Sequence, residues 1–238
     1  APFSTADGVF AVEGDLILTP RFDPEFYLTL IEKHRITHSF MVPTMFTRLL
    51  KLPDAIRLKY DVSSVEHIIH GGSPCPREIK MKMIDWFGPV FFELYGGTET
   101  GIVTYATTKD FLEHPGTVGC AVEGATIKIY DDDGNELPNG QVGEIYCLHI
   151  DCPDFTYQNR HEDRLAMEKY GLLSLGDVGY INEAGYLYIT DRKRDMIISG
   201  GTNIYCTMVE APFLDHPKVL DCAAFGIPHE ELGETLAL

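Results

Sequence analysis

Short apolar runs alternate with segments of helical periodicity over the first hundred residues of the chain. The runs have the length and composition of buried strands, and they predict strands at residues 15–19, 36–42, 65–70 and 91–95. Helices are predicted between the strands. The first begins at Asp23-Pro24-Glu25, where a carboxylate caps the helix and a proline occupies its first position. Strand-helix-strand order with short connections is typical of a parallel sheet.

Two further helices complete this pattern. One covers residues 45–51, and the other begins at Pro76 with an apolar face formed by Ile79, Met83, Ile84 and Phe87. In parallel sheets, ligands bind beyond the carboxyl ends of the strands. Two consecutive predicted strands here end in pairs of glycines, at 71–72 and 96–97, so this edge of the sheet is the expected floor of a binding crevice.

From residue 113 the pattern changes to short alternating segments separated by turns. Strands are predicted at 125–130, 142–148 and 185–189, with turns at 131–134 and 138–140. A charged linker at 191–195 then leads to an apolar segment, a Ser-Gly-Gly turn, a helix from Thr207 and a last strand at 221–227. The predicted fold class is α/β: a parallel βαβ sheet portion, a β-rich barrel-like subdomain, and the start of a small α+β C-terminal domain. We place the boundaries at 1–112, 113–190 and 191–238.

Composition and charge indicate which kinds of ligand or partner the protein could bind. The chain is 45% hydrophobic and 11% aromatic, as in globular proteins, and its formal net charge is −17. Such an acidic protein has no general surface for nucleic acids, so an anionic ligand would need a local basic patch. Arg192-Lys193-Arg194 is one. No stretch reaches the ~18 apolar residues of a membrane helix, and the composition is compatible with a homo-oligomer.

The cysteines and the first residues of the sequence give information about the cellular compartment of the protein. Six cysteines are spread without a C-x-x-C pair, which favours reduced thiols and a cytoplasmic protein. Residues 1–4 lack the basic and apolar regions of a signal peptide. Because the sequence starts without methionine, we expect it to begin inside a longer protein.

The segment Tyr95-Gly96-Gly97-Thr98-Glu99 is the strongest candidate for chemistry. Its glycines lack Cβ atoms, so the backbone can turn sharply and approach a ligand closely. The tyrosine ring could stack on a purine, the Thr98 hydroxyl could bind a phosphate oxygen, and the Glu99 carboxylate is a hard oxygen ligand suited to Mg²⁺. An ordinary turn after a buried strand explains this segment equally well when it is taken alone.

Gly72, Ser73 and Pro74 follow a predicted strand at the expected floor of the crevice. Two further positions complete a nucleotide-binding hypothesis. Asp177 follows the apolar run 172–175, where a carboxylate could accept both hydroxyls of a ribose. Arg192 could reach ribose or phosphate through charge-assisted hydrogen bonds. Each has a plainer alternative, namely a simple turn for the first two and a surface arginine for the third.

Taken together, these segments resemble the adenylate-forming superfamily of acyl-CoA synthetases, luciferases and peptide-synthetase adenylation domains, and within it the fatty-acid–CoA ligase branch. The matching segments are Gly-Gly-Ser-Pro at 71–74, Tyr-Gly-Gly-Thr-Glu at 95–99, Leu-Gly-Asp at 175–177 and the eleven residues 191–201, followed by Asn-Ile-Tyr at 203–205 and Glu210. Four motifs in the same order make chance agreement improbable. The resemblance covers nearly the whole chain.

The resemblance implies a two-step reaction. A carboxylic acid, expected to be fatty-acid-like, attacks the α-phosphorus of ATP to give an acyl-adenylate, and coenzyme A then displaces AMP. Gly72, Ser73 and Pro74 would border the adenine, with Tyr95 stacked on it beside Gly96 and Gly97. Thr98 would bind the α-phosphate, Glu99 would hold Mg²⁺, and Asp177 would bind the ribose. Arg192 would bind ribose or phosphate, and Arg194 would be the hinge of a C-terminal lid domain. The acyl group would lie along residues 41–44 and 70–72, in the first subdomain.

Some residues depart from the pattern of this family. A Ser/Thr/Gly-rich phosphate loop is expected ahead of this region, and a lysine in a Gly-Lys context is expected after it; neither occurs in the sequence. Leu175 replaces the usual threonine before Gly-Asp, and Cys206 and Met208 replace residues that are commonly Pro and Glu. We therefore expect the chain to be an interior part of a ligase and weakly active or inactive alone. Two alternatives stay open: an adenylation domain that loads a carrier-protein thiol, and a non-catalytic nucleotide- or acyl-binding module.

Overall fold

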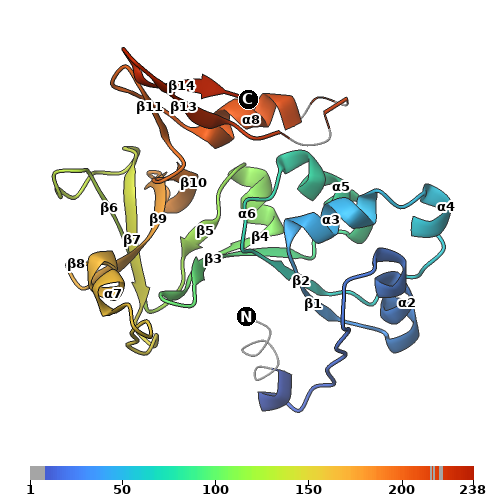
Figure 1. Cartoon of the computed structure of the whole chain (residues 1–238). Coiled ribbons are helices and arrows are strands. Elements are labelled where there is room, and N and C mark those ends of the chain that lie inside the picture. The colour runs from blue at the N-terminus through green and yellow to red at the C-terminus, as the bar shows by residue number, and fades with distance from the viewer. Residues whose placement is uncertain (1–8, 215, 217, 220–221) are drawn as a thin grey trace. The chain divides into compact units, whose positions relative to one another are not determined.

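The computed structural model describes residues 9–214, 216, 218–219 and 222–238 (Figure 1). It divides into two compact units, which are described separately below. Unit 1 comprises Ala1–Leu94 and Thr107–Leu112, and unit 2 comprises Tyr95–Ala106 and Glu113–Leu238. Unit 1 combines helices with parallel strands, and unit 2 contains mostly antiparallel strands. The predicted α/β class, with a parallel portion followed by β-rich structure, is confirmed.

Unit 1 is built on parallel strands linked by helices. Strand β1 (His38–Met41) pairs in parallel with β2 (His67–His70), which pairs in parallel with β3 (Phe91–Gly97). The last residues of β3 belong to unit 2. The helices are α2 (Pro24–His34), α3 (Pro43–Leu50), α4 (Asp54–Arg57), α5 (Arg77–Phe87) and α6 (Thr108–Glu113).

Helix α2 begins where the sequence predicts. The carboxylate of Asp23 accepts a hydrogen bond of 2.9 Å from the backbone N–H of Phe26, and Pro24 occupies the first turn. The helix ends at Arg35, which adopts a left-handed conformation with φ 51°. The buried core of unit 1 draws on helices α2, α3 and α5 and on the parallel strands: Leu28, Ile31, Met41, Phe46, Leu49, Val65, Ile68, Met83, Phe87 and Phe91.

Helix α5 carries a charge on its buried face, which the sequence pattern did not predict. Met83 and Phe87 are buried as expected, but Lys80 is also fully buried and its Nζ lies 2.7 Å from Oε2 of Glu93 on β3. The Lys80 ammonium also lies 4.2 Å from the ring centroid of Phe111. Residues 80, 83 and 87 share one helix face, so the face predicted as wholly apolar contains an ion pair at its start.

Unit 2 contains two sheets. In the larger, neighbouring strands are antiparallel in the order β4 (Gly101–Thr107), β5 (Gly119–Ala121), β10 (Tyr186–Arg192), β9 (Leu172–Ile181), β7 (Gly143–His149) and β6 (Ala125–Tyr130). Strand β8 (Glu168–Lys169) pairs with β9 and follows helix α7 (His161–Met167). The smaller sheet has the order β12 (Thr202–Ile204), β11 (Ile197–Ser199), β14 (Gly233–Ala237) and β13 (Phe225–His229), with helix α8 (Cys206–Leu214) beside it (Figure 1).

Three predicted elements differ from the structure. Residues 15–19 form no strand and are mostly exposed, with Leu18 74% exposed, because an apolar run without a pairing strand has no partner for its backbone groups. Asp191 and Arg192, predicted to start a linker, are the last residues of β10, since they pair with β9. The last strand predicted at 221–227 begins at Phe225, and β14 follows it; Asp221 lies outside the described residues.

Candidate functional site

Tyr95 and Asp177 meet in unit 2. Tyr95 lies near the end of β3 and its hydroxyl donates a hydrogen bond of 2.9 Å to Oδ2 of Asp177, which lies in the middle of β9. Only 7% of Asp177 is exposed. Burial raises the pKa of the Asp177 carboxyl, while the hydrogen bond from Tyr95 and the positive charge of Arg192 lower it in part. Burial also raises the pKa of the Tyr95 phenol, so Tyr95 stays a neutral hydrogen-bond donor.

Arg192 engages the other oxygen of the same carboxylate. Strands β9 and β10 are antiparallel neighbours, and their register places Arg192 directly opposite Asp177. The Arg192 Nε lies 3.4 Å from Oδ1 of Asp177, and about half of the arginine side chain is exposed. A single carboxylate is therefore held between an aromatic hydroxyl and a guanidinium, with the guanidinium reaching the surface.

Glu99 lies on the turn that follows β3. Its Oε1 accepts a hydrogen bond of 2.8 Å from the hydroxyl of Tyr157. A Cβ placed on Gly97 would come within 3.1 Å of both Oε2 of Glu99 and Cδ1 of Leu175. Glu99 and Leu175, which is two residues before Asp177, therefore flank the same glycine. Thr98, beside Glu99, is exposed, and the Cys152 thiol lies 3.5 Å from the Glu99 carbonyl oxygen.

The backbone of this turn requires glycine at one position. Gly96 has φ +145°, a conformation that other residues rarely adopt, and a Cβ there would overlap the carbonyl oxygen of Gly101. Thr100 closes the turn, since its hydroxyl accepts a hydrogen bond of 3.0 Å from the backbone N–H of Gly97. The expected sharp backbone turn is present. The backbone at Gly96 lies closest to the backbone at Gly101, in the second half of the same turn.

A cavity of about 320 Å³ lies at Arg192, the residue that pairs with Asp177. It is lined by Leu175, Gly176, Arg192, Lys193 and Arg194, so three of its five lining residues are basic. Arg194 is 76% exposed on its side chain and pairs with Asp195 at 3.3 Å. The basic patch predicted from the sequence thus faces a hollow beside the buried carboxylate.

Lys193 also connects the 192–194 segment to other parts of unit 2 through ion pairs. Its Nζ lies 2.9 Å from Oδ1 of Asp132 and 2.9 Å from Oε2 of Glu144. These two carboxylates raise the pKa of Lys193. Its backbone N–H donates to the carbonyl oxygen of Gly176 at 2.7 Å. The pair of arginines on either side of Lys193 therefore projects from an anchored segment.

Gly72, Ser73 and Pro74 lie in unit 1, just after β2. They are exposed, and Gly72 has φ +84°. Their neighbour Gly71 lies close to β3, since a Cβ there would come within 2.6 Å of the Leu94 carbonyl oxygen. Tyr95, Glu99, Asp177 and Arg192 belong to unit 2, so a binding site shared by the two groups stays a prediction.

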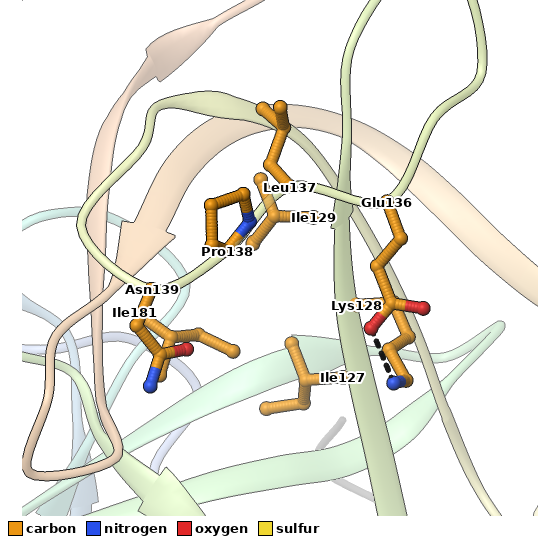
Figure 2. Close-up of a pocket in the computed structure, with 8 residues that line it drawn as sticks. All are labelled: Ile127, Lys128, Ile129, Glu136, Leu137, Pro138, Asn139 and Ile181. Atoms are coloured by element: carbon orange, nitrogen blue, oxygen red, sulfur yellow. Dashed lines mark hydrogen bonds and ion pairs between the residues drawn. The ribbon is translucent and has the colours of Figure 1, made fainter.

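A second, smaller hollow contains none of the predicted site residues. Its volume is about 120 Å³, and Figure 2 shows it between strand β6 and the 136–139 turn. Apolar side chains such as Ile127, Ile129 and Leu137 line it, with Lys128 paired to Glu136 at its edge. The lining of this hollow has one basic residue, Lys128, whereas three basic residues line the larger cavity, so the larger cavity is the better candidate for an anionic ligand.

Magnesium is implied by the family resemblance, and the chemistry of Glu99 fits it. Within the described residues, no group of three or more His, Cys, Asp or Glu side chains could hold a metal ion. Mg²⁺ beside nucleotides does not need such a group, because it keeps several waters and binds one or two carboxylates plus phosphate oxygens. A single oriented carboxylate therefore suits a metal ion that arrives with a nucleotide.

The contacts of two residues in the site region were not predicted from the sequence. Tyr157 contacts Glu99 from 58 positions away, and no local spacing connects them. Lys193 was part of the predicted basic patch, but its bonds to Asp132 and Glu144 depend on the pairing of β7 with β9. Both contacts are long-range consequences of the sheet and have no local sequence signal.

Comparison with known proteins adds a family to this geometry. The model of a family described as AMP-binding enzyme matches residues 8–149. The chain belongs to the AMP-binding enzyme family. The expected resemblance to adenylate-forming enzymes is confirmed. The matched residues include the Gly-Gly-Ser-Pro segment and the whole of Tyr-Gly-Gly-Thr-Glu, whereas Asp177 and Arg192 follow the matched region.

Several members of this AMP-binding family are similar over nearly the whole chain. The long-chain-fatty-acid–CoA ligase of Bacillus subtilis (strain 168) is 35% identical over 225 residues, 93% of this chain and 39% of that protein. The 4-coumarate–CoA ligase 1 of Glycine max is 34% identical over 92% of this chain and 76% of that protein. The chain thus spans about two fifths of the Bacillus subtilis relative.

Solved structures of one similar synthetase contain an acyl-adenylate or ATP with magnesium. The o-succinylbenzoate CoA synthetase MenE of Bacillus subtilis, in complex with its acyl-adenylate intermediate, matches with a TM-score of 0.86 and 29% identity over 98% of this chain and 47% of that chain. A structure of the same synthetase in complex with ATP and magnesium matches with a TM-score of 0.84 over 98% of this chain and 47% of that chain. This chain therefore has the fold of about half of a synthetase whose solved structures contain an acyl-adenylate or ATP with magnesium.

Proposed function

We propose that this chain takes part in the ATP-dependent activation of a carboxylic acid, in which an acyl-adenylate forms and is then transferred to coenzyme A. The observation that carries this proposal is the position of Asp177, held between Tyr95 and Arg192 beside a cavity lined by three cations. A buried carboxylate can accept the two hydroxyls of a ribose, and the cations can receive phosphates. Membership of the AMP-binding enzyme family supports the same ligand.

The individual roles are proposed from the resemblance to adenylate-forming enzymes. Tyr95 offers its ring to the adenine, Asp177 binds the ribose and Arg192 binds ribose or phosphate. Thr98 donates to the α-phosphate. Glu99 would hold Mg²⁺, which when bound would offset the charge of the phosphates. Gly72, Ser73 and Pro74 border the adenine, and Arg194 is the pivot of the C-terminal lid, residues 191–238. The three-part division at 112 and 190 belongs to this proposal.

The acyl substrate is proposed to be fatty-acid-like. Support comes from the similarity to a long-chain-fatty-acid–CoA ligase, while the relatives named for 4-coumarate and o-succinylbenzoate show that this family handles acids of different shapes. A cytoplasmic location is also proposed. Cys75, Cys147, Cys152 and Cys206 are free thiols, as in a reducing compartment. Separately, no helix in the described part of the chain is long and apolar enough to cross a membrane.

The test is nucleotide selectivity at Asp177. Isothermal titration of the chain with ATP and with 2′,3′-dideoxy-ATP, both with Mg²⁺, should show tighter binding of ATP. Replacing Asp177 by Asn keeps the shape but removes the charge, and it should reduce the preference for ATP by about 10-fold or more, since hydrogen bonds to charged groups contribute about 1.5–3 kcal/mol. Asp131→Asn, on an exposed turn, serves as the matched control. Equal preference in wild type and Asp177→Asn would refute the ribose role.

A further inference from the structure

Among the described residues, Tyr157 is the only residue from a distant segment that forms a hydrogen bond with the Glu99 side chain. The hydroxyl has one proton and two neighbouring acceptors, Oε1 of Glu99 at 2.8 Å and the Met167 sulfur at 3.3 Å. A carboxylate is a far stronger acceptor than a thioether, so the proton points to Glu99. Oε1 of Glu99 is therefore occupied by a neutral donor.

The remaining oxygen of Glu99 has a defined direction. Oε2 lies over Gly97, where a Cβ would approach it to 3.1 Å. Gly97 thus leaves room for this oxygen, and Tyr157 restrains rotation of the carboxylate about its terminal torsion, which is otherwise broad. With Oε1 held from one side, the carboxylate presents a single oxygen to a cation.

Tyr157 is itself held in place. Its ring packs edge-on against Phe155 with centroids 5.4 Å apart, and the guanidinium of Arg164 lies 4.9 Å from the centroid of Phe155. Arg164 bonds to Asp154 at 3.0 Å and to Glu168 at 2.8 Å, which joins the 154–157 segment to helix α7 and strand β8. The tyrosine hydroxyl is therefore presented from a supported segment.

We propose that Tyr157 is a positioning residue that orients Glu99 so that Oε2 binds the divalent cation delivered with the nucleotide. This inference rests on the proposed function, since it takes Glu99 as the cation ligand. Mg²⁺ demands near-octahedral geometry with short bonds, so a carboxylate with one restrained oxygen binds it better than a freely rotating one. Groups that hydrogen-bond to metal ligands typically change metal affinity by about 10–100-fold.

The experiment measures cation binding directly. Mn²⁺ replaces Mg²⁺ as the probe, because free Mn²⁺ is quantified by its electron paramagnetic resonance signal. The protein is saturated with α,β-methylene-ATP, which cannot be cleaved at the α–β bond, and titrated with Mn²⁺. Nucleotide affinity in EDTA is measured in parallel. Tyr157→Phe should weaken Mn²⁺ binding to the protein–nucleotide complex about 10–100-fold, and leave the metal-free nucleotide affinity within about 2-fold.

Two comparisons separate orientation from a general structural effect. Tyr170→Phe removes another tyrosine hydroxyl, one that donates to the Gly134 carbonyl oxygen at 3.0 Å, and it should bind Mn²⁺ as wild type does. Glu99→Gln should weaken Mn²⁺ binding by itself. Adding Tyr157→Phe to Glu99→Gln should then change the affinity no further, because the tyrosine acts through the carboxylate.

The outcomes are distinct. Mn²⁺ affinity in Tyr157→Phe equal to wild type, or a further loss in the Glu99→Gln background, overturns the positioning role while leaving the proposed function intact. A loss confined to nucleotide affinity in EDTA also overturns it. Failure of the wild-type protein to bind the nucleotide at all would instead refute the proposed function. Thermal unfolding of each variant shows that the measured protein is folded.

Discussion

The hydroxyl of Tyr95 donates to Asp177 across 82 positions of sequence, and this bond joins the glycine-rich turn after β3 to the centre of β9. The distance of 2.9 Å is that of a normal hydrogen bond to a carboxylate. The bond occupies one oxygen of the group to which we assign ribose binding. The tyrosine therefore has two separable parts: a ring proposed to stack on the base, and a hydroxyl that restrains the carboxylate.

Replacing Tyr95 by Phe should separate these two parts. The ring remains, so the nucleotide affinity in EDTA should fall by less than about 3-fold. Loss of the hydrogen bond to a charged group should lower the free energy of unfolding by about 1.5–3 kcal/mol, measured by urea denaturation. Tyr95→Ala should in addition weaken nucleotide binding by about 1–3 kcal/mol, the usual contribution of base stacking. Equal nucleotide affinities for the Phe and Ala variants would count against stacking.

Gly96→Ala should disrupt the turn after β3. The methyl group would overlap the Gly101 carbonyl oxygen, which is backbone and cannot move aside, and φ +145° costs a further 1–3 kcal/mol or so for a residue with a side chain. We expect the free energy of unfolding to fall by more than about 3 kcal/mol. Gly140→Ala is the matched control. Gly140 has φ +83° with no atom within 4 Å of the added Cβ, so it isolates the conformational cost. Similar losses in both variants would show that the overlap with Gly101 is relieved.

Lys80→Met should be strongly destabilising because it leaves the buried Glu93 carboxylate without its partner. The expected loss in free energy of unfolding is about 3–5 kcal/mol, as for other broken buried ion pairs. Burial already raises the pKa of Glu93, and Lys80 is the group that lowers it. The double variant Lys80→Met with Glu93→Leu removes both charges, and it should recover most of the loss. Guanidinium denaturation of the wild type, both single variants and the double variant gives the coupling energy; a value near zero would contradict the prediction.

His70 should make unit 1 less stable in acid. Its side chain is fully buried, neither ring nitrogen has a hydrogen-bond partner within the described residues, and its ring packs edge-on against Phe46. Burial, assisted by the charge of Lys80, lowers the pKa of His70 to about 3 from 6.5. Between these two values the unfolded chain binds a proton that the folded chain does not. The stability that depends on a neutral His70 is therefore fully present above pH 6.5. As the pH decreases below 6.5, His70 lowers the free energy of unfolding by up to about 1.4 kcal/mol per pH unit.

The test compares His70→Leu with wild type in urea denaturation at pH 7, 6 and 5. The variant should lose the part of the pH dependence contributed by His70. At pH 7 it should be about as stable as wild type, because no unpaired polar atoms are left buried. His34→Gln, an exposed position at the end of α2, should keep the wild-type pH dependence. An unchanged slope in His70→Leu would contradict the prediction, because it would show that His70 binds a proton as readily in the folded chain as in the unfolded chain.

Local patterns predicted much of this fold, and the reasons are visible in particular residues. The start of α2 follows from Asp23 and Pro24, and strand β6 coincides with the predicted 125–130 because its turn chemistry lies in the adjacent sequence. The family and the glycine-rich turn were likewise evident from local motifs. What was missed depends on distant partners: the strand predicted at 15–19 has no pairing strand, and the buried position of Lys80 makes sense only beside Glu93 on β3.

In the candidate site, too, local motifs predicted the residue types, whereas contacts between distant segments were missed. The residue types Tyr95, Glu99, Asp177 and Arg192 could be identified from motifs, but the bond between Tyr95 and Asp177 and the contact of Tyr157 with Glu99 could not. Pairing between strands far apart in sequence creates these contacts, and single-residue patterns contain no information about that pairing.

A consequence follows from the irregular pairing of β9 with β10. The register shifts between Ile189 and Asp191, and this bulge determines which side of the hairpin Arg192 reaches. Adding residues at the 182–185 tip would lengthen the hairpin without moving either end. A regular ladder that included Thr190 would instead place Asp191 opposite Asp177, so the buried carboxylate would keep its tyrosine and face a like charge in place of its cation.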